Sequence, residues 1–225
     1  VERSRGLGDV YKRQDEDCKA IVLRINSPGG SVAGSDAILR ELRRVRKEKI
    51  PVVVSMGAVA ASGGYWIATE CDHLFAGEQT ITGSIGVFGL LPNLKDLAAR
   101  FGINWDSVQT YPHSNLMSVS RPKSDSEMQV IQDYVEVLYE QFIELVSSAR
   151  NLSKKEVKRI AEGRVWVGTD AREIGLIDEF GGIQDAIRKA DEIAQLEGDY
   201  EVREIPEVKT PCLLYTSDAA DDTPC

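Results

Sequence analysis

Residues 19–32 read KAIVLRINSPGGSV, and this stretch decides the fold. Lys19–Asn26 has the apolar run of a buried strand. Ser27–Gly30 breaks that run sharply, because proline and paired glycines end regular structure. Over Ser31–Lys47 apolar residues then recur at helical spacing along one face. The stretch therefore predicts a buried strand, a glycine turn and a crossover helix.

The next segments repeat this alternation. Pro51–Ser55 predicts a second buried strand, Ala58–Thr69 a helix after a tight turn, and His73–Ala76 a short strand. A membrane span over Pro51–Thr69 is the alternative, since these nineteen residues carry no charge. The opening proline, the β-branched run and the internal glycines favour the strand, turn and helix instead. Strands that alternate with helices predict an α/β fold with a mainly parallel sheet.

The C-terminal half predicts further helices. Ser124–Arg150 is the longest regular element, and Ser124 with Glu127 forms a capping box at its start. Its apolar seam suits packing along a partner helix or against the core of its own domain, and both remain open. A second capping box, Ser153 with Glu156, begins a helix that we expect to end near Gly163.

The remaining segments are shorter. Arg164–Val167 predicts an extended piece, and Thr169 caps a predicted helix that ends at Ile174, with Gly175 following it. Leu176–Asp178 predicts a strand, and Ile183–Leu196 a final helix.

Composition narrows the classes of function. The 225 residues are 42% hydrophobic and 28% charged, which is typical of a globular protein that needs no disulfide or metal staples. The formal net charge of −9 argues against nucleic acid as a partner. Cys18 and Cys71 show no CxxC spacing and no ligand cluster around them. We therefore expect neither a metal nor a cofactor.

The two ends of the chain do not read as parts of a fold. Val1–Gln14 and Cys212–Cys225 show no helical or strand period. The DVYKRQ stretch back-translates to a DNA sequence whose reverse complement, read one base later, encodes CLLYTS, the start of the other end. This pattern resembles a transposon-tagging adaptor translated at both ends of a fragment. We expect 1–14 and 212–225 to be disordered, non-native flanks. Residues 15–211 are then one α/β domain truncated at both natural ends.

Two glycine turns are candidates for chemistry. In Ser27–Ser31 (SPGGS), glycines between a strand and a helix leave backbone N–H groups free to stabilise an anion. An ordinary strand-to-helix turn is the alternative. In AASGGYW, Ser62 is a candidate nucleophile, because the flanking small residues permit close approach of a substrate. The N–H of Gly63 and one from Gly29 or Gly30 would supply an oxyanion hole. A helix N-cap is the alternative for Ser62.

The base that would activate the serine has no clear candidate. Neither His73 nor His113 lies in a sequence context that marks a general base, so a Ser–His–Asp triad has little support. A Ser–Lys dyad needs a desolvated lysine, whereas Lys95 and Lys123 lie in polar surroundings.

Four ordered motifs carry a family resemblance. INSPGGSV (25–32), SMGAVAASGGYW (55–66), TGSIGVFG (82–89) and GRVWVGTDAREIGLID (163–178) together resemble signal peptide peptidase A, also called protease IV. The resemblance runs from about Lys19 to Leu196. It implies a crotonase/Clp-protease-like superhelix of repeated β-β-α units, with crossover helices and one long helix. The motif order matches the C-terminal half of the long, tandem-domain form.

The resemblance also implies roles for residues. Ser62 matches the nucleophile, Gly63 and Gly30 match the donors of the oxyanion hole, and Ser84 matches a serine that orients the catalytic lysine. Tyr65 and Trp66, which follow the nucleophile, would support the substrate groove.

One departure from the family pattern concerns the lysine. In the self-sufficient short form it lies in the segment that corresponds to Val108–Pro122, and that segment has no lysine here. In the long form an N-terminal half supplies the lysine, so this chain would be the serine half of a Ser/Lys peptidase.

The resemblance further implies the setting of that peptidase. Its substrates would be remnant signal peptides and other small hydrophobic segments. It would be a homo-oligomer on the outer face of a bacterial cytoplasmic membrane, with the anchor before residue 15. The alternatives are a crotonase-type acyl-CoA enzyme and a non-catalytic assembly domain.

Overall fold

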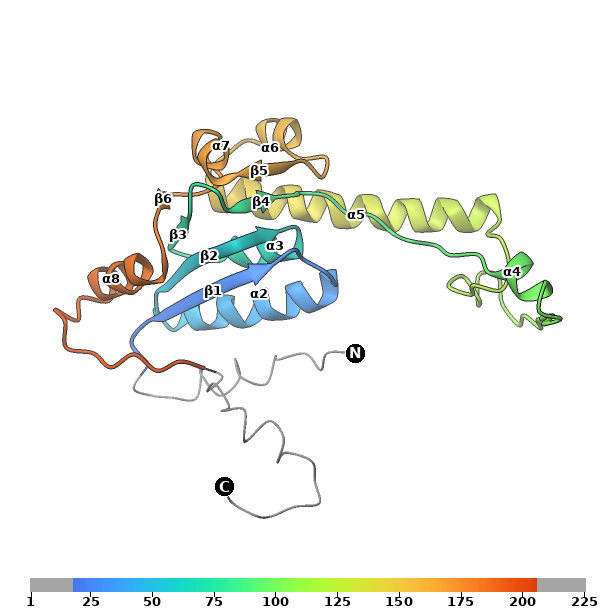
Figure 1. The fold of residues 1–225 in the computed structure, drawn as a ribbon, viewed down its shortest axis with the longest axis horizontal. Coiled ribbons are helices and arrows are strands. Elements are labelled where there is room, and N and C mark those ends of the chain that lie inside the picture. The colour runs from blue at the N-terminus through green and yellow to red at the C-terminus, as the bar shows by residue number, and fades with distance from the viewer. Residues whose placement is uncertain (1–17, 206–225) are drawn as a thin grey trace, which may run out of the picture.

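The computed structural model describes residues 18–205, so the flanks predicted at 1–14 and 212–225 lie outside the described residues. The chain begins with strand β1 (Ile21–Ser27), helix α2 (Val32–Lys47), strand β2 (Val52–Ala61) and helix α3 (Gly63–Ala68). Figure 1 shows α2 and α3 together on one side of β1 and β2. The predicted strand, glycine turn and helix are confirmed, and the Ser31 hydroxyl caps α2 by accepting from the Gly34 N–H.

The sheet is mixed and mainly parallel, as predicted. Its path is β5–β4–β2–β3–β6, and β1 pairs with the other edge of β2. The added strands are β3 (His73–Ala76), β4 (Ile81–Gly83), β5 (Val165–Val167) and β6 (Glu179–Phe180). β4 and β5 pair antiparallel, and the other pairs are parallel. The α/β prediction is therefore confirmed.

Two predicted boundaries around the sheet are wrong. Ala58–Ala61 was expected to begin a helix, but these residues continue β2, and Val59–Ala61 pair with Ile81–Gly83 of β4. Small apolar residues suit a crowded sheet centre as well as a helix, so periodicity could not separate the two. Leu176–Asp178 was expected to be a strand, but β6 begins one residue later.

The last third of the chain follows the predicted order, with shifted ends. Helix α6 (Lys154–Ile160) starts at the predicted capping box but ends three residues before Gly163. Helix α7 (Gly168–Glu173) begins directly after β5, with Val167 at the N-cap position. Thr169 therefore lies inside the first turn of the helix and does not cap it. Helix α8 (Ile183–Ala194) begins as predicted and ends two residues early.

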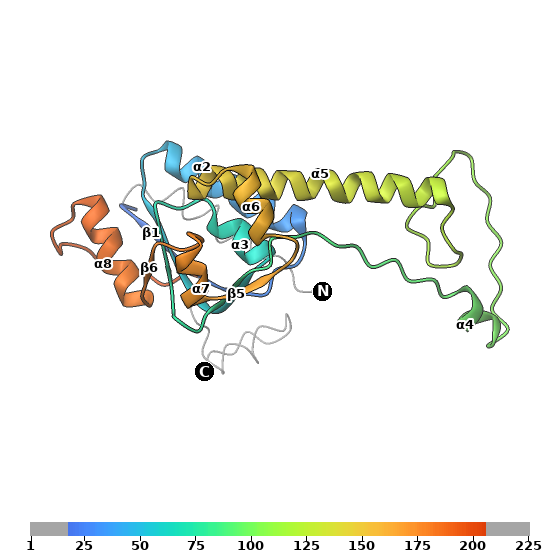
Figure 2. The same ribbon diagram turned by 90° about the horizontal axis from the view of Figure 1, so that it is seen from above.

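Helix α5 (Asp125–Arg150) has two different halves. Its C-terminal half packs on the core through Phe142, Ile143 and Val146, all buried. Its N-terminal half extends beyond the sheet, and helix α4 (Lys95–Ala99) lies beyond the same side of the sheet, apart from α5 (Figures 1 and 2). Of the two readings left open for the apolar seam, packing on the domain's own core therefore accounts for one half of the helix.

A partly buried ion pair joins the end of α5 to the sheet. Arg150 donates to both carboxylate oxygens of Asp178, at 2.7 and 3.1 Å, and to the Gly175 carbonyl at 2.8 Å. The Leu74 N–H of β3 also donates to Asp178. Burial opposes ionisation of Asp178, but the hydrogen bonds from Arg150 outweigh it and lower the pKa of the carboxyl below its ordinary value.

Replacing Arg150 should therefore cost much more stability than replacing an exposed arginine. We expect Arg150→Met to lower the free energy of unfolding by about 2–4 kcal/mol, because a half-buried carboxylate loses its partner. Arg40→Met is the matched control, since Arg40 is 70% exposed in its pair with Asp36 and should cost less than about 1 kcal/mol. Urea unfolding followed by tryptophan fluorescence measures both.

The same pair predicts a pH dependence. The folded-state pKa of Asp178 is lowered, so its stabilisation is present above the unfolded pKa and is lost as the pH falls through the folded value. The difference in the free energy of unfolding between wild type and Arg150→Met should thus become smaller below about pH 3.8, the ordinary pKa of this carboxyl. A gap that is constant from pH 7 to pH 2.5 would contradict this account.

Candidate active site

Ser62 occupies a sharp turn between the end of β2 and the start of α3. Its backbone has φ 52° and ψ −120°, a left-handed conformation that costs a non-glycine residue about 1–3 kcal/mol. Two hydrogen bonds hold the turn: the Ser62 N–H donates to Gly83 O at 2.9 Å, and the Trp66 N–H donates to Ser62 O at 2.8 Å. A strained serine between a strand and a helix is the geometry of a nucleophile elbow.

The Ser62 side chain is not used as a helix cap. Ser62 precedes α3, yet its hydroxyl makes no capping hydrogen bond, and the residue is partly exposed. The N-cap alternative therefore does not explain why a serine stands at this strained position.

The SPGG turn packs directly against the Ser62 turn. Gly29 and Gly30 have φ of 107° and 147°, which favour glycine. A Cβ on Gly29 would lie 2.7 Å from the Gly63 nitrogen and 2.8 Å from the Ser62 Cβ. The approach of these two turns thus depends on the absence of a side chain at residue 29.

This packing brings two backbone amides together. A Cβ on Gly63 would lie 3.3 Å from the Gly30 nitrogen. Gly63 is the first residue of α3, so its N–H has no acceptor within the helix. Neither the Gly63 N–H nor the Gly30 N–H finds an acceptor elsewhere in residues 18–205. Unpaired donors beside a strained serine are the arrangement that an oxyanion hole requires.

Ser84 lies beside Ser62 through the register of the sheet. Ala61 of β2 pairs with Gly83 of β4, and the two serines are the next residues of these parallel strands. Ser84 also has a positive φ, 50°, and its N–H donates to Arg164 O at 2.7 Å. Sequence reasoning did not predict β4, so only the family resemblance indicated this position.

Tyr65 and Trp66 lie in the core rather than on the surface. Tyr65 is fully buried, and its hydroxyl donates to Leu176 O at 2.7 Å. Burial raises the pKa of this phenol above its ordinary value. Trp66 is 3% exposed and packs against Phe142 of α5, with the rings tilted by 48° and their centroids 4.8 Å apart. Both side chains anchor α3 from beneath, so neither offers surface to a groove.

The candidate bases lie away from Ser62. His73 of β3 pairs with Val53, near the end of β2 that lies away from Ser62. Its ring packs on that of Phe75, with 4.6 Å between the ring centroids. His113 and Lys123 lie in the segment between α4 and α5, and Lys123 donates to the Ser118 carbonyl. No lysine, histidine or carboxylate hydrogen-bonds to Ser62 within the described part of the chain.

Metal chemistry has no support in the described residues. Residues 18–205 contain no group of three or more His, Cys, Asp and Glu side chains that could hold a metal ion. Cys71 is partly buried, and burial raises the pKa of its thiol to about 12, so it is a poor ligand and a poor nucleophile.

Comparisons with known proteins agree with this site. The family model for Peptidase family S49 matches residues 44–197, and that for Clp protease matches residues 10–73. Protease 4 of Haemophilus influenzae is 40% identical over 190 residues, covering 84% of this chain and 31% of the relative. Protease 4 of Salmonella typhi is 44% identical over 184 residues, which cover 82% of this chain and 30% of the relative.

A shorter relative is covered more fully. The putative protease slr0021 of Synechocystis is 37% identical over 186 residues, which cover 83% of this chain and 67% of that protein. The chain thus spans about a third of the long protease 4 relatives and two thirds of the shorter one. With the Clp-like fold and the serine turn in place, these matches show that the chain belongs to peptidase family S49, the signal peptide peptidase A (protease IV) family of serine peptidases.

Proposed function

We propose that this chain is the serine half of an endopeptidase that digests remnant signal peptides and other small hydrophobic segments. One observation carries the proposal: Ser62 stands in a strained turn beside two unpaired amides, with no base in hydrogen-bond reach within residues 18–205. A strained serine is retained at a cost, and catalysis is the use that such geometry has.

The chemistry follows from these groups. A base takes the hydroxyl proton of Ser62 as Oγ bonds to the scissile carbonyl carbon, and the carbonyl oxygen becomes an oxyanion held by the Gly63 and Gly30 N–H groups. The intermediate collapses, the C–N bond breaks, and the leaving amine takes the proton from the base. Water then hydrolyses the acyl-serine by the same steps.

We assign the base to a lysine outside this chain. Within residues 18–205 no lysine forms a hydrogen bond to Ser62 or Ser84. Two lysines of α6 form ion pairs with α5 instead, Lys154 with Glu144 and Lys158 with Glu140. Ser84, beside Ser62, would accept a hydrogen bond from that lysine and orient it. The greater length of the protease 4 relatives supports a partner half that carries the lysine.

The two alternatives have less support. A crotonase-type acyl-CoA enzyme needs a carboxylate at the oxyanion hole, and among the described residues no carboxylate hydrogen-bonds to the Ser27–Gly30 turn or to Ser62. A non-catalytic assembly domain would have no reason to keep a serine at φ 52°.

We also propose that residues 15–211 form one peptidase domain that assembles with other copies. The projecting arm, residues 86–137, carries large apolar side chains in solvent, with Phe88 90%, Leu90 84% and Phe101 77% exposed. Apolar surface of this extent is typical of an interaction site. The outer face of the cytoplasmic membrane is the proposed location. No helix in residues 18–205 has the length and apolar character needed to cross a bilayer.

A glycine substitution tests the oxyanion hole and thereby the function. In the presence of a long-form N-terminal half, a fluorophosphonate probe should label Ser62 of the wild-type chain. Gly29→Ala should slow labelling by about 10²-fold, because the new methyl group pushes the two amides apart. Gly89→Ala is the matched control, since a Cβ there meets nothing within 4 Å. Equal labelling of both variants would reject the assignment of the two amides.

A further inference from the structure

A buried hydroxyl lies next to the two amides of the candidate oxyanion hole. It belongs to Ser35, near the start of α2, and only 7% of this residue is exposed. A Cβ on Gly63 would lie 2.6 Å from the Ser35 Oγ and 3.3 Å from the Gly30 nitrogen. The hydroxyl and the Gly30 amide therefore surround one point beside Gly63, whose own N–H is the second donor of the hole.

The position of Ser35 on its helix would suit an apolar residue. The buried face of α2 consists of Ser35, Leu39, Leu42 and Val45, which follow one another in steps of three and four. The three aliphatic members of this face belong to the core of the domain. A hydroxyl in the same row needs an explanation, because burying a hydroxyl without a partner costs free energy.

The Ser35 hydroxyl has no such partner in the described part of the chain. The backbone N–H of Ser35 donates to Ser31 O at 3.0 Å, but its hydroxyl forms no hydrogen bond within residues 18–205. Two nearby serines differ in this respect. The Ser27 hydroxyl accepts from the Gly29 N–H at 3.2 Å, and the Ser31 hydroxyl accepts from the Gly34 N–H at 3.3 Å. An unpaired hydroxyl at this place can therefore bond to a ligand.

The dipole of α2 favours a negative charge at the same place. The helix is 16 residues long, and its N-cap, Ser31, directly follows the SPGG turn. Its first turn contains no acidic residue, so no side chain there neutralises the positive end of the dipole. A negative charge that develops between Gly30 and Gly63 would also be stabilised by this field.

We propose that the Ser35 hydroxyl is a third donor of the oxyanion hole, an inference that rests on the proposed function of Ser62. When the Ser62 Oγ bonds to the scissile carbonyl carbon, the carbonyl oxygen becomes negatively charged. This oxygen then accepts hydrogen bonds from the N–H groups of Gly63 and Gly30 and from the Ser35 O–H. Ser35 keeps its proton throughout, so it stabilises charge and does not replace the missing base.

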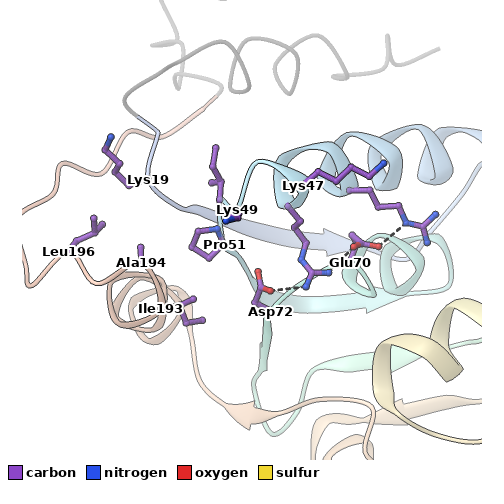
Figure 3. Close-up of a pocket in the computed structure, with 12 residues that line it drawn as sticks. Lys19, Lys47, Lys49, Pro51, Glu70, Asp72, Ile193, Ala194 and Leu196 are labelled. Atoms are coloured by element: carbon purple, nitrogen blue, oxygen red, sulfur yellow. Dashed lines mark hydrogen bonds and ion pairs between the residues drawn. The ribbon is translucent and has the colours of Figure 1, made fainter.

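Other contacts hold α2 in place, so the effect of a substitution at Ser35 can be interpreted. Near the far end of the helix, Arg43 donates to Glu70 at 2.9 Å, and Arg46 donates to Glu70 and to Asp72 at 2.7 Å each. Figure 3 shows Glu70 and Asp72 with these ion pairs as dashed lines. We therefore expect α2 to keep its position when one oxygen atom is removed near its other end.

The test replaces Ser35 by alanine in the full chain, mixed with the N-terminal half of a long-form relative. For a hydrophobic signal-peptide fragment, kcat should fall by about 10–10²-fold with KM nearly unchanged, because the lost hydrogen bond forms only in the transition state. The affinity for a peptide aldehyde, which places its oxygen in the hole when it adds to Ser62, should fall by a similar factor. The melting temperature should not fall, because Ser35→Ala removes no hydrogen bond of the folded chain.

Two further variants separate donation from packing. Ser35→Cys keeps a side chain of similar shape but is a weak donor, so its kcat should fall as in Ser35→Ala. Ser147→Ala is the matched control for a structural hydroxyl, since Ser147 of α5 donates to Leu152 O at 2.6 Å. This control should lower the melting temperature and leave kcat unchanged.

The outcomes distinguish the role of Ser35 from the function of Ser62. Wild-type kcat in Ser35→Ala or Ser35→Cys would overturn the third donor, and so would a loss of kcat that accompanies unfolding at the assay temperature. If neither the aldehyde nor a fluorophosphonate reacts with Ser62 in the wild-type mixture, the proposed function is rejected, and the role of Ser35 with it.

Discussion

Mixing this chain with the N-terminal half of a long-form relative is expected to raise its peptidase activity by about 10²–10⁴-fold. The reason lies in the surroundings of Ser62. The oxyanion donors are present, but within residues 18–205 no basic side chain forms a hydrogen bond to the Ser62 hydroxyl. A serine hydroxyl attacks slowly when no group takes its proton. The chain alone should retain only the residual rate that the oxyanion hole provides.

The measurement compares cleavage of a hydrophobic signal-peptide fragment by residues 15–211 alone and in the mixture. The control is an N-terminal half in which the lysine at the family's base position is replaced by methionine, which should not raise the rate. Lys123→Ala and His113→Ala in this chain should leave the activity of the mixture unchanged, because both residues lie between α4 and α5. Full activity of the chain alone, lost in either variant, would show an internal base and end the half-site account.

Local patterns were sufficient to predict much of the fold. The capping boxes at Ser124 and Ser153 mark the true starts of α5 and α6, because the serine hydroxyl and the glutamate carboxylate three residues later each accept from the free backbone N–H of the other residue. The run Lys19–Asn26 and the glycines after it similarly predict β1 and the turn to α2.

Long-range contacts explain what the sequence could not predict. Whether Ala58–Ala61 is strand or helix depends on the pairing of Val59–Ala61 with Ile81–Gly83, 22 residues further along the chain. β4 is itself only three residues long and has no periodicity of its own. The exposure of the apolar arm, residues 86–137, likewise could not be predicted, because it depends on α5 reaching the core only from Phe142 onward.

The site was predictable in type but not in geometry. Small residues around Ser62 indicated a nucleophile, yet its positive φ depends on the hydrogen bond to Gly83 O. The proximity of Gly29 to Gly63 arises from the parallel pairing of β1 with β2. Tyr65 and Trp66 show the converse, because a residue beside a nucleophile can equally face the core.

In the reconstituted enzyme, replacing Ser62 and replacing Ser84 are expected to lower kcat to different extents. Ser62→Ala removes the atom that bonds to the substrate, so kcat should fall by about 10⁴–10⁶-fold. Ser84→Ala leaves the nucleophile in place and removes only the group that orients the lysine, so kcat should fall by about 10²–10³-fold. Ser148→Ala, an exposed serine of α5, is the control and should have no effect.

The pH–rate profile separates the two roles. In Ser84→Ala the loss should be smaller at high pH, because a lysine without its hydrogen-bond partner still deprotonates there and acts as a base. Ser62→Ala should lose activity equally at every pH, because no base can replace the missing Oγ. Fluorophosphonate labelling should vanish in Ser62→Ala and persist at a reduced rate in Ser84→Ala. A Ser84→Ala enzyme with wild-type kcat across the pH range would show that Ser84, although it lies next to Ser62 in the sheet, takes no part in activating it.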